Sequence, residues 1–476
     1  MAVNNLFIFI YFSLFINILN AQNPLIDYYP PSPVPDRIIL NYKDNPATSI
    51  GVNWRTAVSV QKGYGQIAKA TAGPDFDSIQ VVKAERELLV SDLNAAHYYS
   101  IQFTGLEPNT LYAYRVGDST LWSEWSHFRT AADKEAPFSF IYFGDAQNDL
   151  KSKWSRTIRQ AYSHLPQANI MLHAGDLINI PQRDHEWGEW FYAGGWIYQN
   201  IPSIMTPGNH EYRRITPTQS ELSTHWKPSF NLPENGPEGL KETCYYIDYQ
   251  NTRFISINSQ AFLNNPQDSA KQVDWLKQIL VNNRNKWTVV TMHHPIYSPA
   301  WERDNPRLRN ALKPLFDQYN IDLVLQGHDH TYARGGNNLP TGSTVIDSTG
   351  PVYVVSVSGP KMYVSSLLSW IDRAAMETQL YQIIHINGDS LIYEAFTTIG
   401  ELYDKFEIIK NNKTGQKQFK DLAPAGVPER LSEQFARKMS DEDWAQWVTN
   451  FEAYKARRQA KEQGAATQKG KKRKRG

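Results

Sequence analysis

The chain has 476 residues, which is longer than one usual domain and predicts two domains with extensions. Its 49 basic and 48 acidic residues leave a formal net charge of +1, so we expect no global attraction to nucleic acid or to an anionic membrane. Cys244 is the only cysteine, which excludes a disulfide within the chain, a cysteine-based zinc site and a redox pair.

The N-terminal segment has the pattern of an export signal. A mostly apolar run from Leu6 to Leu19 precedes Asn20-Ala21-Gln22, a small-residue cleavage site. The run lacks a basic start, since the first basic residue is Arg37, and an uncleaved membrane anchor is the alternative. Because the run is short for a span of roughly 20 residues, we expect a signal peptide over residues 1–21. The protein is then exported (periplasmic or secreted), with no transmembrane segment after cleavage.

The next segment predicts a linker and a small all-β domain. Residues 22–35 include a Pro-rich stretch at 30–35, which favours an extended linker. From residue 36 to about 131, short apolar or alternating runs are separated by turns, with no helical period between them. These runs lie at 37–40, 49–54, 98–103, 111–116 and 125–130. Strands at this spacing are typical of a β-sandwich.

From residue 136 the pattern changes to strands alternating with helices. Apolar strand-like runs lie at 138–143, 170–173, 201–206, 254–258, 287–292 and 321–325. Between them, Trp154, Ile158 and Ala161 have the spacing of one helix face, and residues 273–280 contain another such face. Later strands, at 351–357, 381–386 and 391–396, follow one another directly. We therefore expect an α/β domain with some hairpin pairing over residues 136–400.

Residues 401–476 have the composition of a C-terminal extension. The segment 428–460 is charged and favours a helix, with Trp444, Trp447 and Phe451 at i, i+3 and i+7. The basic residues at 469–475 predict a solvated, disordered end rather than a nucleic-acid partner. No feature of the sequence indicates the oligomeric state.

Five predicted strands of the α/β domain end in clusters of polar residues. The clusters are Gly144-Asp145-Ala146-Gln147, Gly175-Asp176-Leu177-Ile178-Asn179, Gly208-Asn209-His210-Glu211, His293-His294-Pro295 and Gly327-His328-Asp329-His330. Each one alone is explained by a turn or a helix cap. Their joint occurrence favours a common site, because open α/β sheets present ligand sites at their strand ends.

The residue types in these clusters suit two metal ions that share a bridging carboxylate. Carboxylate, amide oxygen and imidazole together suit borderline divalent ions or ferric iron, and the lack of an available thiolate argues against a closed zinc site. Two ions roughly 3.5–4 Å apart can hold a hydroxide and clamp the oxygens of an in-line phosphoryl displacement.

In this order, the clusters resemble the calcineurin-like metallophosphoesterase family across roughly residues 138–396. Segments 104–110, 112–118 and 128–131 are similar to the fibronectin-type-III-like N-terminal domain of the purple acid phosphatases. The resemblance implies a four-layer α/β sandwich over residues 136–400, with its site at the strand ends. It also implies an all-β sandwich of the immunoglobulin or fibronectin-III kind over residues 36–131.

The resemblance further implies a role for each site residue. Six side chains would bind two metal ions: Asp145 and His330 at the first, Asn209, His293 and His328 at the second, and Asp176 as the bridge between both. His210, beside a ligand but not one itself, would be catalytic, facing the phosphate and aiding departure of the leaving group.

Two positions depart from the family pattern. The purple enzymes have a tyrosine three residues after the bridging aspartate, where this chain has Asn179; other members place a histidine two residues after the first aspartate, where this chain has Gln147. Gln147 or Asn179 would then be an additional metal or substrate contact through an amide oxygen, or water would fill the place. The expected cofactors are two metal ions, divalent such as Mn, Mg or Zn, or Fe, and we expect little of the purple colour that a tyrosinate gives.

These observations favour hydrolysis of phosphate monoesters by a metal-bridged hydroxide. The chain would be a metal-dependent phosphoric ester hydrolase, acting on a phosphorylated small molecule or ester. One alternative is a phosphodiesterase or nucleotide hydrolase that uses the same site. Another is a non-catalytic exported binding protein with a degenerate site, because the first metal has few ligands. The substrate stays open, because specificity lies in loops that no motif describes.

Overall fold

A computed structural model describes residues 26–473 of the chain, except residues 217–218, 338, 341 and 412. The expected signal peptide, residues 1–21, lies outside the described residues. None of the described helices combines the length and the apolar character that crossing a bilayer requires.

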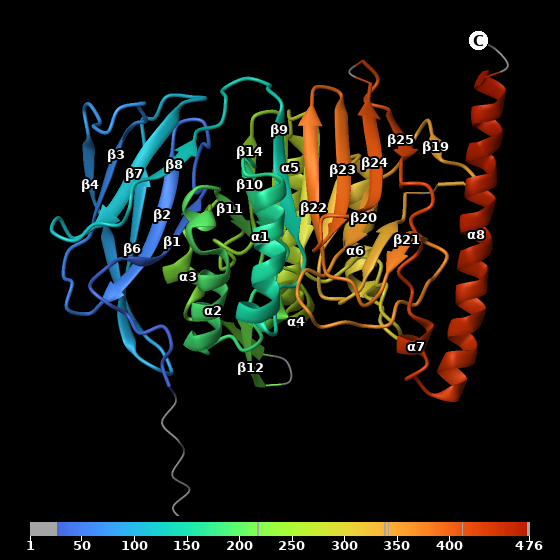
Figure 1. Ribbon diagram of the computed structural model, residues 1–476, viewed down its shortest axis with the longest axis horizontal. Helices are drawn as coiled ribbons and strands as arrows, with labels where there is room; N and C mark the ends of the chain where they lie inside the picture. Colours follow the sequence, from blue (N-terminus) through green and yellow to red (C-terminus); the bar gives the residue numbers. More distant parts are fainter. Residues whose placement is uncertain (1–25, 217–218, 338, 341, 412, 474–476) are drawn as a thin grey trace, which may run out of the picture.

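The N-terminal domain is a β-sandwich of two four-stranded layers (Figure 1, blue). One layer contains β1 (Asp36–Asn41), β2 (Ile50–Ala57), β5 (Glu85–Val90) and β6 (Ala95–Phe103). The other contains β3 (Tyr64–Lys69), β4 (Gln80–Lys83), β7 (Leu111–Gly117) and β8 (Ser126–Arg129). Aromatic side chains fill the space between the layers, as in the contact of Phe103 with Tyr114, whose ring centroids are 6.4 Å apart. The predicted all-β domain is confirmed.

The α/β domain contains two large sheets, and the first is continuous with the N-terminal domain. Its order is β19-β25-β24-β23-β22-β9-β10-β11, and a parallel pair between Ser203 of β11 and Asn41 of β1 joins it to β1-β2-β6-β5. Its central strands are β9 (Phe138–Phe143), β10 (Ile170–His173) and β11 (Ser203–Met205), which run parallel. The antiparallel strands are β19 (Val345–Ile346), β22 (Leu380–Asn387), β23 (Ser390–Thr397), β24 (Leu402–Lys410) and β25 (Lys417–Asp421).

The second sheet has seven strands in the order β14-β15-β16-β17-β20-β18-β21. They are β14 (Tyr245–Tyr249), β15 (Thr252–Ile257), β16 (Trp287–Met292), β17 (Leu323–Gln326), β18 (Tyr332–Gly335), β20 (Val352–Val355) and β21 (Ile371–Ala375). The two sheets pack face to face through aromatic side chains, such as Phe140 and Phe254 at 5.2 Å between ring centroids.

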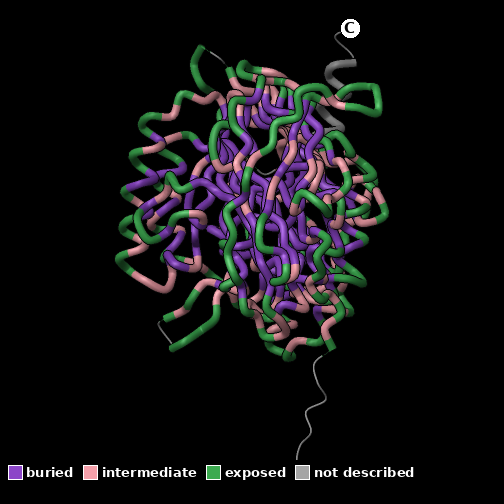
Figure 2. Tube along the Cα trace, turned by 90° about the vertical axis from the view of Figure 1, so that its left-hand side faces the viewer, coloured by how far each residue is buried: buried purple, intermediate pink, exposed green. Residues whose placement is uncertain are grey.

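Helices cover the outer faces of both sheets. The first sheet is covered by α1 (Ser155–His164) and α2 (Asp184–Gly194), with a π-helix at Leu150–Trp154 and 3-10 turns at Gly195–Gln199 and Asn209–Glu211. The second is covered by α4 (Ser259–Asn264), α5 (Pro266–Val281) and α6 (Pro306–Gln318). A short helix α3 (Trp226–Ser229) and a hairpin of β12 (Tyr212–Thr216) and β13 (Gln219–Leu222) complete the region. The predicted four-layer α/β sandwich is confirmed, and Figure 2 shows its buried segments running through the centre.

The C-terminal extension differs from the prediction, because its strands and its helix pack as part of the α/β domain. The expected boundary at residue 400 falls between β23 and β24, and the first sheet continues to Asp421. After α7 (Glu433–Ala436), the long helix α8 (Asp441–Arg473) packs Trp447, Phe451 and Tyr454 against residues of β18 and β21 (Figure 1, red). The helix enters the basic end that was expected to be disordered, and residues 474–476 lie outside the described part.

Candidate metal centre

The candidate centre lies where the carboxyl ends of five parallel strands from both sheets meet. Asp145, Asp176 and Asn209 follow β9, β10 and β11 of the first sheet. His293 follows β16 of the second sheet, and the segment from His328 to His330 follows β17. The two packed sheets thus bring together six side chains that are far apart in the sequence.

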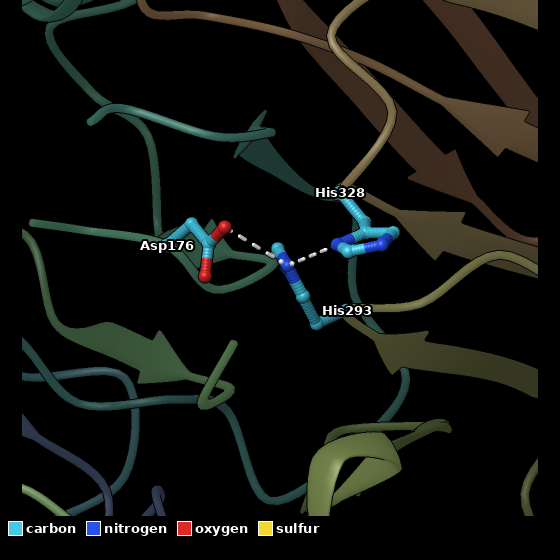
Figure 3. A group of neighbouring side chains, drawn as sticks. All are labelled: Asp176, His293 and His328. Carbon is cyan, nitrogen blue, oxygen red and sulfur yellow. Dashed lines mark hydrogen bonds and ion pairs between the residues drawn. The ribbon is translucent and has the colours of Figure 1, made fainter. Parts of the chain in front are cut away.

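These side chains form two groups that share one carboxylate. Asp176, His293 and His328 form one group, and Asp145, Asp176 and His330 form the other; in each, the ligand atoms lie within 4.8 Å of one another. Figure 3 shows Asp176 and His328 directed at His293 from two sides. Asp176 is the member common to both groups, which is the position expected of a bridging ligand.

In the group around His293, the approaching atoms are electron-pair donors. His293 Nε2 lies 3.1 Å from Asp176 Oδ2, 3.0 Å from Asn209 Oδ1 and 3.2 Å from His328 Nδ1. The other ring nitrogen of His293, Nδ1, is 2.9 Å from the Ala174 carbonyl oxygen and donates to it, which leaves the lone pair of Nε2 facing the group. Oxygen and nitrogen lone pairs that converge in this way fit a metal cation.

The group around His330 has the same construction. His330 Nδ1 donates to the Lys361 carbonyl oxygen at 3.0 Å, so the lone pair of Nε2 faces Asp145 Oδ2 at 3.2 Å. That carboxylate oxygen is buried and accepts no hydrogen bond from the described residues. A buried carboxylate oxygen without a donor is costly unless a cation neutralises it, so this group also fits a metal ion.

The two positions that depart from the family pattern have different places in the structure. Gln147 lies inside the group around His330: its Nε2 is 3.1 Å from Asp176 Oδ2 and 3.0 Å from His330 Nε2. Its Oε1 is buried without a partner among the described residues, and exchanging the two amide atoms would aim that oxygen into the group. Asn179 contributes through its backbone, because its carbonyl oxygen accepts from His210 Nδ1 at 2.5 Å.

His210 is partly accessible to solvent. Its side chain is 26% exposed, whereas that of Asp176 is 1% exposed, and its Nε2 lies 4.0 Å from Asp176 Oδ2. Its backbone N–H donates to Asp176 Oδ1 at 2.8 Å. The bond to the Asn179 carbonyl places the proton on Nδ1, so the open side of the ring presents Nε2.

Two glutamates that the sequence interpretation did not assign hold the loop that carries Asp176. Glu211 Oε2 accepts the backbone N–H groups of Asp176 at 2.9 Å and Gly208 at 2.6 Å, and Oε1 accepts that of Leu177 at 2.8 Å. Glu186 Oε2 accepts the N–H groups of residues 179 and 180 at 2.6 and 2.8 Å. In the sequence, the position of Glu211 next to His210 indicates that it belongs to the site. The sequence around Glu186, on α2, gives no such indication of its role.

The backbone at the centre is held in unusual conformations. Asp176 and His328 have φ angles of 52° and 70°, in the left-handed region that residues other than glycine rarely adopt. Glycines next to the ligands allow close approach: a Cβ at Gly208 would overlap Asp176 Oδ1, and one at Gly327 would overlap Asp145 Oδ1. Such strain persists where the surrounding structure fixes it, as is common at functional sites.

The buried negative charges of the centre favour binding of a cation. Burial lowers the pKa of His293, but the carboxylates of Asp176 and Asp145 outweigh it and raise that pKa to about 9. Burial is the main cause that raises the pKa of Asp145 to about 8, and the charge of Asp176 acts in the same direction. Without another cation, Asp145 and His293 therefore retain protons, which bound metal ions would displace.

Comparisons with known proteins agree with the fold. The family model for calcineurin-like phosphoesterase matches residues 138–332, and that for the purple acid phosphatase N-terminal domain matches residues 35–130. Purple acid phosphatase 13 of Arabidopsis thaliana is 26% identical over 302 residues, 55% of this chain and 54% of that protein. An uncharacterized protein of Mycobacterium tuberculosis is 26% identical over 373 residues, 67% of this chain and 68% of that protein.

Among solved structures, the purple acid phosphatase PPD1 from yellow lupin (Lupinus luteus) seeds has a similar fold. Its TM-score is 0.67 at 18% sequence identity, and the match covers 80% of this chain and 75% of that one. This likeness concerns the fold. The match to the Arabidopsis protein spans little more than half of that protein's length.

Proposed function

The chain carries a calcineurin-like phosphoesterase domain behind a purple acid phosphatase N-terminal domain, and from this premise we propose that it hydrolyses phosphate monoesters with two metal ions. The observation that carries the proposal is the shared carboxylate of Asp176, which belongs to both convergent groups of ligand atoms. A single shared carboxylate between two such groups suits a pair of ions about 3.5–4 Å apart, which is the spacing of two-metal phosphoesterases.

The residues that would hold the two ions are those of the two groups. Asp145, Asp176 and His330 would bind the first ion, completed by the Gln147 amide oxygen, and Asp176, Asn209, His293 and His328 would bind the second. When bound, two such ions lower the pKa of a water molecule and neutralise charge on the phosphate oxygens. Because the ligands are carboxylate, amide and imidazole with no thiolate, manganese, magnesium, zinc and iron are the ions to test.

The side chains around the centre supply positioning and proton transfer. His210 faces the open side with Nε2, because its Nδ1 proton is held by the Asn179 carbonyl. A protonated Nε2 at this position would give its proton to the leaving-group oxygen as the ester bond breaks. Glu186 and Glu211 accept five backbone N–H groups, four from residues 176–180 and one from Gly208, and so hold the segment that carries Asp176 and Asn179.

Turnover of two aryl esters by metal-loaded protein tests this proposal. Protein stripped with a chelator and reloaded with each candidate ion is assayed with 4-nitrophenyl phosphate and with bis(4-nitrophenyl) phosphate. We expect hydrolysis of the monoester, its loss on chelation and its restoration by at least one of the four ions. Faster hydrolysis of the diester would favour the phosphodiesterase alternative. If fully loaded protein hydrolysed neither ester, the reading as a non-catalytic binding protein would replace this proposal.

We also propose that the protein is exported, with a phosphorylated small molecule or ester as its substrate. The support is the apolar run from Leu6 to Leu19 and the cleavage site after it. Mass spectrometry of the protein recovered from the native host tests this directly. A mature N-terminus near residue 22 is expected, and an intact N-terminus on protein retained inside the cell would contradict it.

A further inference from the structure

Beside His330, at the edge of the candidate centre, three side chains form a surface that we call the Tyr363 platform: Arg303, Lys361 and Tyr363. The ring of Tyr363 lies against the ring of His330, with centroids 4.7 Å apart. Two cations lie near the same ring: Arg303 Cζ is 4.6 Å and Lys361 Nζ is 5.5 Å from its centroid. A half-buried aromatic ring with two cations beside it thus adjoins a candidate metal ligand.

The backbone fixes the Tyr363 platform to the candidate centre. The carbonyl of Lys361 accepts from His330 Nδ1 at 3.0 Å, and the N–H of Tyr363 donates to the His330 carbonyl at 2.8 Å. The neighbouring side chains of Pro360 and Met362 line a separate hollow of about 440 Å³. Lys361 and Tyr363 thus both contact His330 through their backbones.

Hydrogen bonds hold Arg303 beside the Tyr363 ring. Its Nη1 donates to Asp329 Oδ1 at 3.1 Å and to the His328 carbonyl at 3.4 Å, and its Nη2 lies 3.4 Å from the Tyr363 hydroxyl oxygen. Asp329 is fully buried, whereas the Arg303 side chain is 36% exposed. The buried carboxylate therefore orients the guanidinium and neutralises part of its charge, while donors stay accessible from solvent.

Lys361 carries the less compensated of the two charges. It forms no ion pair within the described part of the chain, and its side chain is half-buried. Its ammonium nitrogen lies 5.5 Å from the centroid of the Tyr363 ring, which packs against the ring of His330. An ammonium group beside the reaction centre without a carboxylate partner is suited to meet an anion from the substrate.

The charge balance at the centre indicates which anion this is. Two divalent ions and the two carboxylates of Asp145 and Asp176 leave two positive charges, which a phosphate monoester dianion already neutralises. The cations of the Tyr363 platform lie outside this balance, beside the ring of His330. They are available to a second negative charge, and the Tyr363 ring offers a flat surface to the carbon skeleton between the two charges.

Resting on the function proposed above, we propose that Lys361 and Arg303 form an anion subsite that selects phosphate monoesters whose leaving group carries a second negative charge. The substrate class is that of phosphorylated acids, in which a carboxylate or a second phosphate lies a few bonds from the ester oxygen. Lys361 supplies most of the attraction, and Arg303 supplies directed hydrogen bonds. Tyr363 positions the leaving group between them.

A matched pair of esters tests this specificity. We would measure kcat/KM for phenyl phosphate and for 4-carboxyphenyl phosphate with manganese-loaded wild type, Lys361→Met, Lys361→Glu and Arg303→Lys. The ratio that favours the carboxylated ester should fall about 1.5- to fivefold in Lys361→Met, the range of a partly exposed charge pair, and further in Lys361→Glu. Arg303→Lys should retain part of the preference, because it keeps the charge. Lys277→Met, on an exposed face of α5, is the matched control and should keep the wild-type ratio.

Binding of unreactive analogues separates failure of the subsite from failure of the proposed function. Calorimetry with phenylphosphonate and 4-carboxyphenylphosphonate should give tighter binding of the carboxylated compound, lost in Lys361→Glu and weakened by salt. If wild type turned over neither ester, the proposed function would fail, and these affinities alone would decide the subsite. Equal ester ratios and equal phosphonate affinities in wild type and Lys361→Glu would overturn the anion subsite.

Discussion

Replacing Glu211 by alanine is the change whose cost follows most directly from the structure. The Glu211 carboxylate is fully buried and accepts three backbone N–H groups, those of Asp176, Leu177 and Gly208. Each buried donor left without a partner costs about 1–3 kcal/mol, so the free energy of unfolding should fall by about 3–9 kcal/mol. Water that enters the space would bring the loss toward the lower figure. Against a typical total of about 5–15 kcal/mol, this loss is severe.

Glu211→Gln should cause a smaller loss in the free energy of unfolding than Glu211→Ala. A glutamine oxygen in the place of Oε2 keeps two of the three acceptor contacts, while its amide group faces the Leu177 N–H. The expected loss is therefore about one third of that in Glu211→Ala, or about 1–3 kcal/mol. This variant keeps the test decisive even if Glu211→Ala does not fold.

Urea unfolding of the metal-free proteins measures these differences, because bound metal would add its own stabilisation. Glu452→Ala, which removes an exposed carboxylate of α8 paired with Lys455, is the matched control and should unfold like the wild type. A Glu211→Ala protein within 1 kcal/mol of the wild type would refute the view that this carboxylate holds the Asp176 loop.

Four further outcomes are expected. Asp176→Asn should abolish turnover and weaken both metal sites without unfolding the protein, and normal metal content with near-wild-type turnover would contradict the bridging role. His210→Ala should keep its metal and lose about 10²–10⁴-fold in kcat, whereas loss of metal would make His210 a ligand. The protein should be colourless or faintly coloured, because Asn179 supplies no phenolate; strong visible absorption of the iron-loaded form would count against this. Asp184→Asn should lose about 3–5 kcal/mol of stability at pH 7 by breaking a buried pair with Arg37. Burial raises the pKa of Asp184, but His225 and Arg37 outweigh it and hold that pKa well below its usual value. The stability difference between wild type and Asp184→Asn should therefore shrink as the pH falls below about 4. A difference in chemical unfolding that does not change with pH would argue against the pairing.

Much of the fold was predictable because its central strands are buried on both faces. Strands such as β9, β10 and β16 form largely apolar runs in the sequence, as buried parallel strands do. The exposed strands β4 and β5 of the N-terminal domain were missed, since most of their side chains face solvent and leave no apolar alternation. Local patterns therefore identified the core of each domain and not its edges.

The C-terminal boundary was predicted less well, for a related reason. The helix α8 was recognisable from Trp444, Trp447 and Phe451, but sequence spacing does not show what a helix packs against. In the structure, Lys461 on α8 pairs with the buried Asp421 at 2.6 Å, and the Trp447 indole donates to the Ser365 carbonyl. Both contacts join residues that are more than 30 positions apart in the sequence.

The candidate centre was also predictable only in part. The ligand types and their order were predictable because each one follows a strand, and the sheet topology brings these strand ends together. The roles of Glu186 and Glu211 were not, because they act through backbone N–H groups of other segments. The place of the Gln147 amide beside His330 likewise depends on how three loops meet.

Activity measured as a function of bound metal tests the central claim most directly. Metal-free protein is titrated with manganese while bound ions per chain and turnover of 4-nitrophenyl phosphate are recorded in the same samples. If Asp176 joins two sites, turnover should appear as the second ion binds and should saturate at two ions per chain. Saturation at one ion per chain, or protein that holds two ions and hydrolyses nothing, would contradict the two-metal phosphoesterase.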